Sequence, residues 1–108
     1  MLFLVEMDRV KSGITPTPES GRVFIEQIIF PTLARAEQLV AEKKILAGGP
    51  TVGRVALRFI IEAASLPEAD RMISSLPLWR VAETSVIPLE DFADRRTTLQ
   101  GLLDSLAG

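Results

Sequence analysis

The stretch from residue 45 to residue 63, ILAGGPTVGRVALRFIIEA, predicts two strands joined by a tight turn over Thr51 to Gly53. Ile45 to Pro50 supplies the first strand, and Arg54 to Ala63 supplies the second, in which apolar residues alternate. Because successive side chains of a strand point to opposite faces, one face is wholly apolar and the other is mixed. The apolar face carries Val55, Leu57, Phe59 and Ile61, and the mixed face carries Arg54, Ala56, Arg58, Ile60 and Glu62.

Two more strands are predicted, one before and one after this hairpin. Leu2 to Asp8 has an apolar face and a face that turns acidic, and Trp79 to Leu89 alternates in the same manner. Arg9 to Pro18, rich in Gly, Ser, Thr and Pro, is expected to be a loop. The faces that we expect to point away from the core carry Leu2, Leu4, Glu6 and Asp8 in the first strand and Val81, Glu83, Ser85 and Ile87 in the last.

Helical patterns fill the two intervals between the strands. Apolar residues recur at three and four positions from Ile25 to Val40, after a helix start at Thr17 to Glu19. Pro31 lies inside this pattern, so we expect a kink or a break near residues 28–30. Ser65 and Glu68 have the spacing of a capping box for a second helix, which Pro77 ends.

The order strand, helix, strand, strand, helix, strand predicts an α+β protein of the ferredoxin-like βαββαβ type, with an antiparallel four-stranded sheet and both helices on one face. Residues 1–89 form this domain, and residues 90–108 form a C-terminal amphipathic helical tail whose leucines are expected to dock on this subunit or on a neighbour. The half-apolar second face of the sheet predicts a homodimer or a higher homo-oligomer.

Composition excludes several classes of function. The chain has 108 residues and a net charge of −2, which argues against nucleic acid as a partner. Without cysteine or histidine there is no disulfide, no thiolate or imidazole metal site and no Ser-His-Asp triad, so acid–base work would depend on Asp, Glu, Lys or Ser. No apolar stretch is long enough to span a membrane, and the opening MLFLV has no basic leader, so we expect a cytoplasmic protein.

Three segments resemble the muconolactone isomerase-like family of the dimeric α+β barrel superfamily. They are the opening MLFLVEM, the segment KILAGGPTVGR after the kinked helix, and LPLWRVAETSVIPL at the end of the sheet. The resemblance implies two sheets packed face to face in a dimer, and a proton shift in a bound unsaturated lactone without metal or organic cofactor. Members of the family typically carry a His and a Lys on the first strand where this chain has Leu4 and Glu6, which argues against the same substrate.

The predicted catalytic set is Glu6, Glu83 and Arg58, which three strands project to one sheet face. Glu6 would carry the proton, Glu83 would be its partner, and Arg58 would anchor an anion. The alternative is a salt-bridge network between subunits, because ionic networks also shift pKa values without catalysing a reaction.

The predicted substrate-binding residues are Leu4, Ile60, Ser85, Trp79 and Phe24. Trp79 would be a pocket wall or ordinary core packing, and Phe24 would line a ligand entrance beside Pro31 or pack in the core. Glycines 48, 49 and 53 lack the neighbouring Lys and Ser or Thr of a phosphate loop, so a hairpin with a bulge is preferred.

The expected function is cofactor-independent isomerisation of a small cyclic or unsaturated metabolite. One alternative is a non-catalytic dimeric module that binds a small molecule or stabilises an assembly. The other is a cofactor-free oxygenase or cyclase of the same superfamily.

Overall fold

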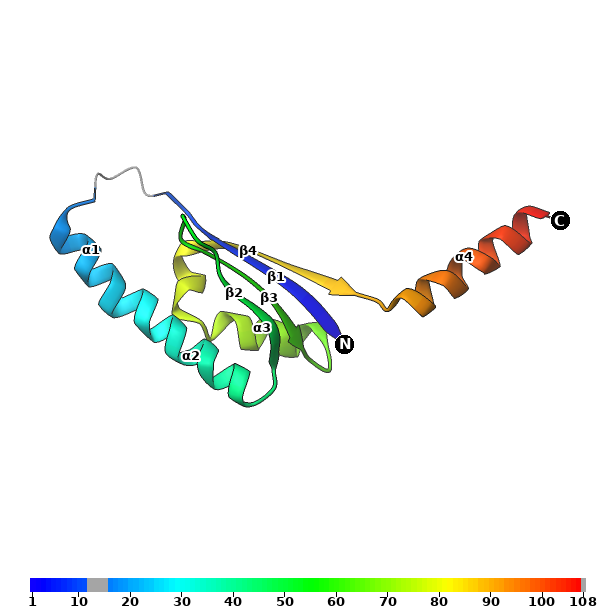
Figure 1. The fold of residues 1–108 in the computed structure, drawn as a ribbon, viewed down its shortest axis with the longest axis horizontal. Coiled ribbons are helices and arrows are strands. Elements are labelled where there is room, and N and C mark those ends of the chain that lie inside the picture. Colours follow the sequence, from blue (N-terminus) through cyan, green and yellow to red (C-terminus); the bar gives the residue numbers. More distant parts are fainter. Residues whose placement is uncertain (12–15, 108) are drawn as a thin grey trace.

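In the computed structural model, residues 1–11 and 16–107 are described and form one sheet with helices on one side of it (Figure 1). Residues 12–15, within the predicted loop, and residue 108, at the end of the predicted tail, lie outside the described residues. The elements in chain order are β1 Leu2–Arg9, α1 Pro18–Phe24, the π-helical turn η1 Ile25–Ile29, α2 Phe30–Ala41, β2 Ile45–Pro50, β3 Ala56–Glu62, α3 Leu66–Ser74, the 3₁₀ turn η2 Pro77–Val81, β4 Ala82–Leu89 and α4 Phe92–Ala107.

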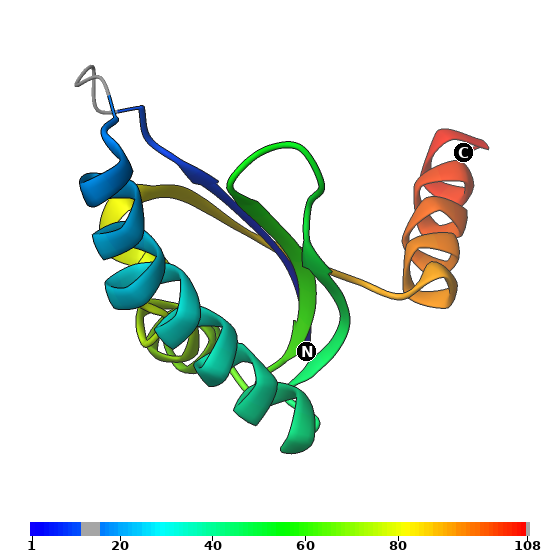
Figure 2. The ribbon, with the colours of Figure 1, turned by 60° about the vertical axis from the view of Figure 1, so that its left-hand side comes forward.

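The four strands lie in the order β2-β3-β1-β4, and each neighbouring pair is antiparallel. Helices α1, α2 and α3 cover one face of this sheet, as Figure 2 shows. This arrangement confirms the predicted ferredoxin-like α+β fold.

Alternation along β1 and β3 separates the two faces of the sheet, as predicted. Phe3, Val5 and Met7 have no exposed surface, and they pack with the helix-facing residues of β3 and with the inner sides of α2 and α3. The core residues from these other elements are Leu57, Phe59, Ile61, Leu39, Ala69, Met72 and Ile73. Burial of this set at about 25 cal/mol per Å² of apolar surface is the main force that holds the layers together.

The long helix is interrupted as Pro31 predicts. Thr17 caps its start, since the Thr17 hydroxyl accepts a hydrogen bond from the Ser20 N–H at 3.1 Å. The turn Ile25–Ile29 is π-helical, and α2 begins at Phe30. Proline has no N–H to donate to the preceding turn, and a π-helical turn accommodates the missing hydrogen bond without ending the helix.

The hairpin contains the predicted bulge, at the register shift between Ile45 and Ala47. Gly48 has a φ of +106°, and a Cβ atom at this position would lie 2.1 Å from the carbonyl oxygen of Arg58. The backbone of β2 therefore approaches β3 more closely than any residue with a side chain allows.

The second helix is capped by Ser65, whose hydroxyl accepts a hydrogen bond from the Glu68 N–H, and it ends before Pro77. The predicted start of the last strand at Trp79 is wrong, because Pro77–Val81 forms a 3₁₀ turn and β4 begins at Ala82. Proline fixes a φ that suits the start of a helical turn, so the alternation of residues 79–81 does not continue the strand.

Helix α4 stands apart from the body of the molecule (Figures 1 and 2). None of its residues is buried, so its leucines do not dock on this subunit, which was one of the two predicted possibilities. The exposed apolar side chains of this helix are Phe92, Leu99, Leu102, Leu103 and Leu106.

The bulge predicts that alanine substitutions at two adjacent glycines differ in their effect on stability. Gly48→Ala should lower the free energy of unfolding by about 2 kcal/mol or more, since alanine must adopt a left-handed φ against the backbone of β3. Gly49→Ala is the matched control, because a Cβ atom there meets nothing within 4 Å. Urea unfolding of both variants measures the difference, and equal stabilities would contradict this account of the bulge.

Candidate functional site

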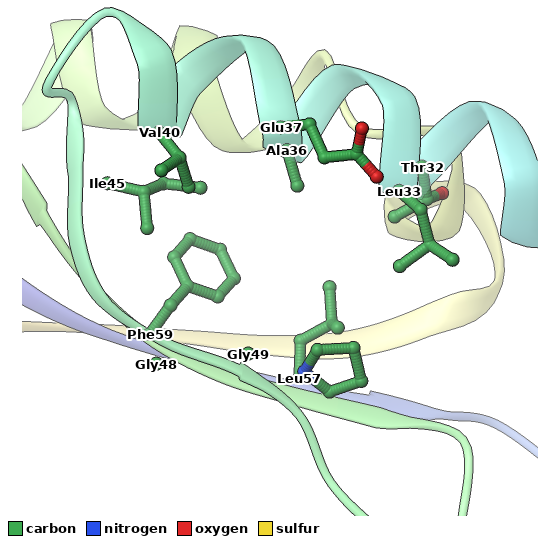
Figure 3. A pocket seen from close by; sticks show the side chains of 11 residues that line it. Thr32, Leu33, Ala36, Glu37, Val40, Ile45, Gly48, Gly49, Leu57 and Phe59 are labelled. Carbon is green, nitrogen blue, oxygen red and sulfur yellow. The ribbon is translucent and has the colours of Figure 1, made fainter.

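Two adjoining pockets lie between the helices and the β2–β3 half of the sheet. The larger has a volume of about 460 Å³ and the smaller about 310 Å³. Both are lined by Thr32, Leu33, Pro50 and Leu57, and together we call them the layer groove. Figure 3 shows the smaller pocket, with α2 on one side and β2 and β3 on the other.

Local sequence explains why the groove is open. Gly48 and Gly49 line its β2 side next to Phe59 and Leu57 of β3, and they place no side chain in the groove. On the helical side, Ile25 and Ile29 from the π-helical turn line the larger pocket. The groove therefore lies where glycines and the helix interruption reduce packing between the two layers.

The walls of the groove are mostly apolar, with few polar groups. Glu37 lines the smaller pocket, and Figure 3 shows its carboxylate beside Leu33 and Ala36. Arg9 and Arg54 line the larger pocket. A carboxylate and guanidinium groups bordering an apolar cavity are suited to proton transfer and to binding an anion.

Thr32 is the buried polar residue of the groove, with only 2% of its surface exposed. Its hydroxyl accepts a hydrogen bond of 2.9 Å from the Leu78 N–H, which joins α2 to η2. This hydroxyl therefore fixes the wall of the groove, because a buried N–H without a partner is costly.

The larger pocket also contains a stacked pair. The guanidinium carbon of Arg9 lies 3.7 Å from the centre of the Phe24 ring, within the range of cation–π attraction. Phe24, predicted to bind substrate, therefore lines the larger pocket and supports a cationic side chain there.

Apart from Trp79, the other predicted residues lie on the sheet face opposite the helices, which we call the open sheet face. Strand pairing places Glu6 between Arg58 and Ser85, and Leu4 between Ile60 and Ile87. The structure thus brings these residues together in two adjacent rows. None of them lines either pocket of the layer groove, which lies on the opposite side of the sheet.

Arg58 does not pair with Glu6, the residue across from it. Its Nη2 atom lies 3.0 Å from Asp8 Oδ2 and 3.1 Å from Asp8 Oδ1, and Arg54 also binds Asp8. Glu83 is exposed and lies across from Asp8 instead of Glu6. The predicted catalytic set is therefore split between two rows of the sheet.

Asp8 is the charged residue that the sequence prediction missed in this region. Partial burial raises the pKa of the Asp8 carboxyl, but hydrogen bonds and positive charge from Arg54 and Arg58 outweigh that effect and hold the pKa below its usual value. The sequence placed Asp8 on the same face as Glu6, but alternation does not show which carboxylate a long arginine side chain reaches.

Trp79 belongs to the 3₁₀ turn and is 44% exposed, so it is neither buried core nor a wall of the layer groove. The groove residues Arg9, Arg54 and Glu37 were not predicted as site residues. A signal existed for Arg9, since it continues the alternation of Phe3, Val5 and Met7 onto the helix-facing side.

Within residues 1–11 and 16–107, no group of three or more Asp and Glu side chains is arranged to hold a metal ion. No described helix is long and apolar enough to cross a membrane.

The strand order, the antiparallel pairing and the one-sided helical layer define a muconolactone isomerase-like fold, which confirms the predicted resemblance at the level of the fold. Muconolactone isomerase itself matches with a TM-score of 0.67 and 20% identity, over 84% of this chain and 90% of that chain. The 5-chloro-2-hydroxyhydroquinone dehydrochlorinase of Burkholderia phenoliruptrix, in complex with 2,5-dihydroxybenzoquinone, matches with a TM-score of 0.62 and 26% identity, over 87% and 98% of the two chains. No protein-family model and no curated protein sequence matches the chain.

The ion pairs of Asp8 predict a pH effect with a defined sign. Because its pKa is lowered, ionised Asp8 stabilises the folded state above pH 3.8, and this contribution is lost as the pH falls below that value. A carboxyl ¹³C NMR titration should give a pKa below 3.8 for Asp8, and Arg58→Gln should raise it. Arg71→Gln, on exposed α3 surface, is the control, and an Asp8 pKa unaffected by loss of Arg58 would contradict the assigned pairing.

Proposed function

We propose that this protein is a cofactor-independent enzyme that moves a proton within a small cyclic or unsaturated metabolite bound in the layer groove. The observation that carries the proposal is the groove itself, where an apolar cavity meets one carboxylate and two guanidinium groups. Its pockets of about 460 and 310 Å³ are of a size that small-molecule sites use.

The names of the two structural neighbours support this substrate class. One is an isomerase of a lactone, and the other is a dehydrochlorinase of a substituted hydroquinone, in complex with a dihydroxybenzoquinone. Both names refer to small oxygenated rings. A ring of that size fits the volume of the larger pocket.

Glu37 is the proposed proton carrier. Its carboxylate would take a proton from one carbon of the ligand, and the resulting carboxylic acid would return the proton to another carbon, so that the product is an isomer. Neither electrons nor a further reactant are consumed. Leu33, Leu57 and Phe59 would cover the apolar side of the bound ring, and the exposed position of Glu37 would place its carboxylate at the rim of the pocket.

The alternative position for the chemistry is the open sheet face, with Glu6 as proton carrier, Glu83 as its partner and Arg58 as anion anchor. A second subunit would have to enclose that face. Arg58 has a structural role in one subunit, since its Nη2 group donates to both oxygens of Asp8 and its Nη1 group donates to the Leu57 carbonyl.

Glutamine variants of Glu37 and Glu6 distinguish the layer groove from the open sheet face as the position of the chemistry. With a panel of unsaturated five-membered lactones in D₂O, followed by ¹H NMR, Glu37→Gln should lower kcat by about 100-fold or more, as expected for loss of a general acid–base group. Glu26→Gln is the matched control, because Glu26 is exposed on η1 and lines neither pocket.

Loss of turnover in Glu6→Gln with full activity in Glu37→Gln would place the chemistry on the open sheet face. No turnover of any lactone by the unaltered protein would overturn the isomerase proposal.

A second candidate function is that of a non-catalytic dimeric module for small-molecule binding or assembly. The open sheet face favours it, because Leu2, Ile87 and Leu89 are each about two-fifths exposed there beside half-buried Leu4 and Ile60. A monomer would leave this half-apolar surface in water, whereas a homodimer would cover it. Dimerisation is compatible with either function, since the layer groove lies on the other side of the sheet.

The oligomeric state tests the role of that face. Ile60→Arg should convert a dimer into a monomer in size-exclusion chromatography with light scattering, because two arginines would be buried across the symmetry axis. Val52→Arg, in the fully exposed hairpin turn, is the matched control. An unaltered protein that is monomeric at millimolar concentration would contradict the proposed interface.

A further inference from the structure

Thr32 places a buried hydroxyl at the junction of the two pockets of the layer groove. It lines both pockets, and only 2% of its surface is exposed. Its oxygen accepts a hydrogen bond of 2.9 Å from the Leu78 N–H. A threonine hydroxyl also carries a proton of its own, and a buried donor without a partner is costly. The partner of this proton therefore needs an explanation.

The proton of the Thr32 hydroxyl has no acceptor among residues 1–11 and 16–107. A threonine within a helix can donate to the carbonyl four residues earlier. Thr97 and Thr98 do so in α4, each at 3.1 Å from its acceptor. For Thr32 that carbonyl belongs to Ile28, inside the π-helical turn, where backbone hydrogen bonds run from residue i to i+5. The Thr32 proton thus remains available to a ligand.

We propose that the Thr32 hydroxyl donates a hydrogen bond to a carbonyl oxygen of the bound ligand, at the point where the two pockets meet. This inference rests on the proposed function in taking the layer groove as the ligand site. It adds a second catalytic residue to Glu37, because the hydroxyl contacts the oxygen on which negative charge develops when a neighbouring carbon loses its proton.

The surroundings of Thr32 fit a neutral oxygen better than a charged group. The other residues that line both pockets, Leu33, Pro50 and Leu57, are apolar. A ligand atom at the junction therefore meets one hydroxyl and no charged side chain, so an ionic group there would lose its hydration without a counter-charge. A carbonyl oxygen loses less hydration, and its hydrogen bond is stronger in apolar surroundings than in water.

The position of Thr32 also agrees with a proton shift by Glu37. Figure 3 shows Thr32, Leu33 and Glu37 on α2, with the Glu37 carboxylate turned toward the other two side chains. When Glu37 takes a proton from carbon, the electron pair of the broken C–H bond moves toward the carbonyl oxygen and forms an enolate. Thr32 keeps its own proton and stabilises that oxygen. Return of the proton from Glu37 to another carbon restores the carbonyl group.

The test uses 2-cyclopentenone, a five-membered ring with one carbonyl group, as the probe. In an NMR titration of the full chain, the probe should shift the backbone amides of Thr32, Leu33 and Leu57. The infrared carbonyl stretch of the bound probe should lie at lower frequency in the unaltered protein than in Thr32→Val, which lacks the donor. Thr32→Val should also bind the probe about fivefold more weakly, as loss of one neutral hydrogen bond predicts.

Two further variants separate the donor from a structural effect. Thr32→Ser keeps a hydroxyl that can accept from Leu78 and donate to the probe, so it should retain the stretch, the affinity and the kcat for lactones. Thr32→Val should lower that kcat by about 100-fold. Thr84→Val is the matched control, because the Thr84 hydroxyl is buried without a partner but lines neither pocket. Urea unfolding of each variant reports the cost of losing the bond to Leu78.

Equal carbonyl stretches in the unaltered protein and in Thr32→Val would overturn the proposed donor, as would a Thr32→Ser variant that behaves like Thr32→Val. The same loss of affinity in Thr84→Val would overturn the assignment to Thr32. Full activity in Glu37→Gln, with the difference in stretch intact, would overturn the proposed function and leave the Thr32 hydrogen bond in place. Amide shifts on the open sheet face in place of the groove would overturn both.

Discussion

The pairing of β1 with β3 on one side and with β4 on the other is the constraint on which the rest of the structure depends. β1 is the strand that brings three completely buried side chains, Phe3, Val5 and Met7, against the helices. Its register then decides which polar residues meet on the opposite face, because a shift of one residue would exchange the two faces. The core and the open sheet face are therefore fixed by the same hydrogen bonds.

Two local departures from regular structure create the space beside this core. Gly48 permits a close approach of β2 to β3, and Pro31 is accommodated by a π-helical turn instead of a break. Each lies on one side of the layer groove, so irregular backbone borders the groove on both the sheet side and the helical side. Irregular helical turns of this kind are frequent at functional sites.

The fold could be predicted because periodicity and turn chemistry agree in each element, from the alternation in β1 to the Ser65 cap. The start of β4 could not, since the apolar–polar–apolar pattern of residues 79–81 is typical of a strand, whereas Pro77 begins a 3₁₀ turn that contains them. The candidate site was harder to predict from the sequence. Alternation assigns a residue to a face of the sheet, but it does not show which residues a long side chain contacts. Arg58 extends past Glu6 to Asp8, and the groove lies on the side of the sheet that the sequence assigned entirely to core.

Arg54 borders the layer groove on one side of the sheet and holds Asp8 on the other. A ligand in the groove that displaced this guanidinium group would weaken its contact with Asp8 and leave more negative charge on the open sheet face. Thermodynamic linkage is reciprocal, so a subunit or ligand that engages Asp8 changes the affinity of the groove by the same factor. Arg54, at the end of the hairpin, would thus couple binding in the layer groove to binding at the open sheet face.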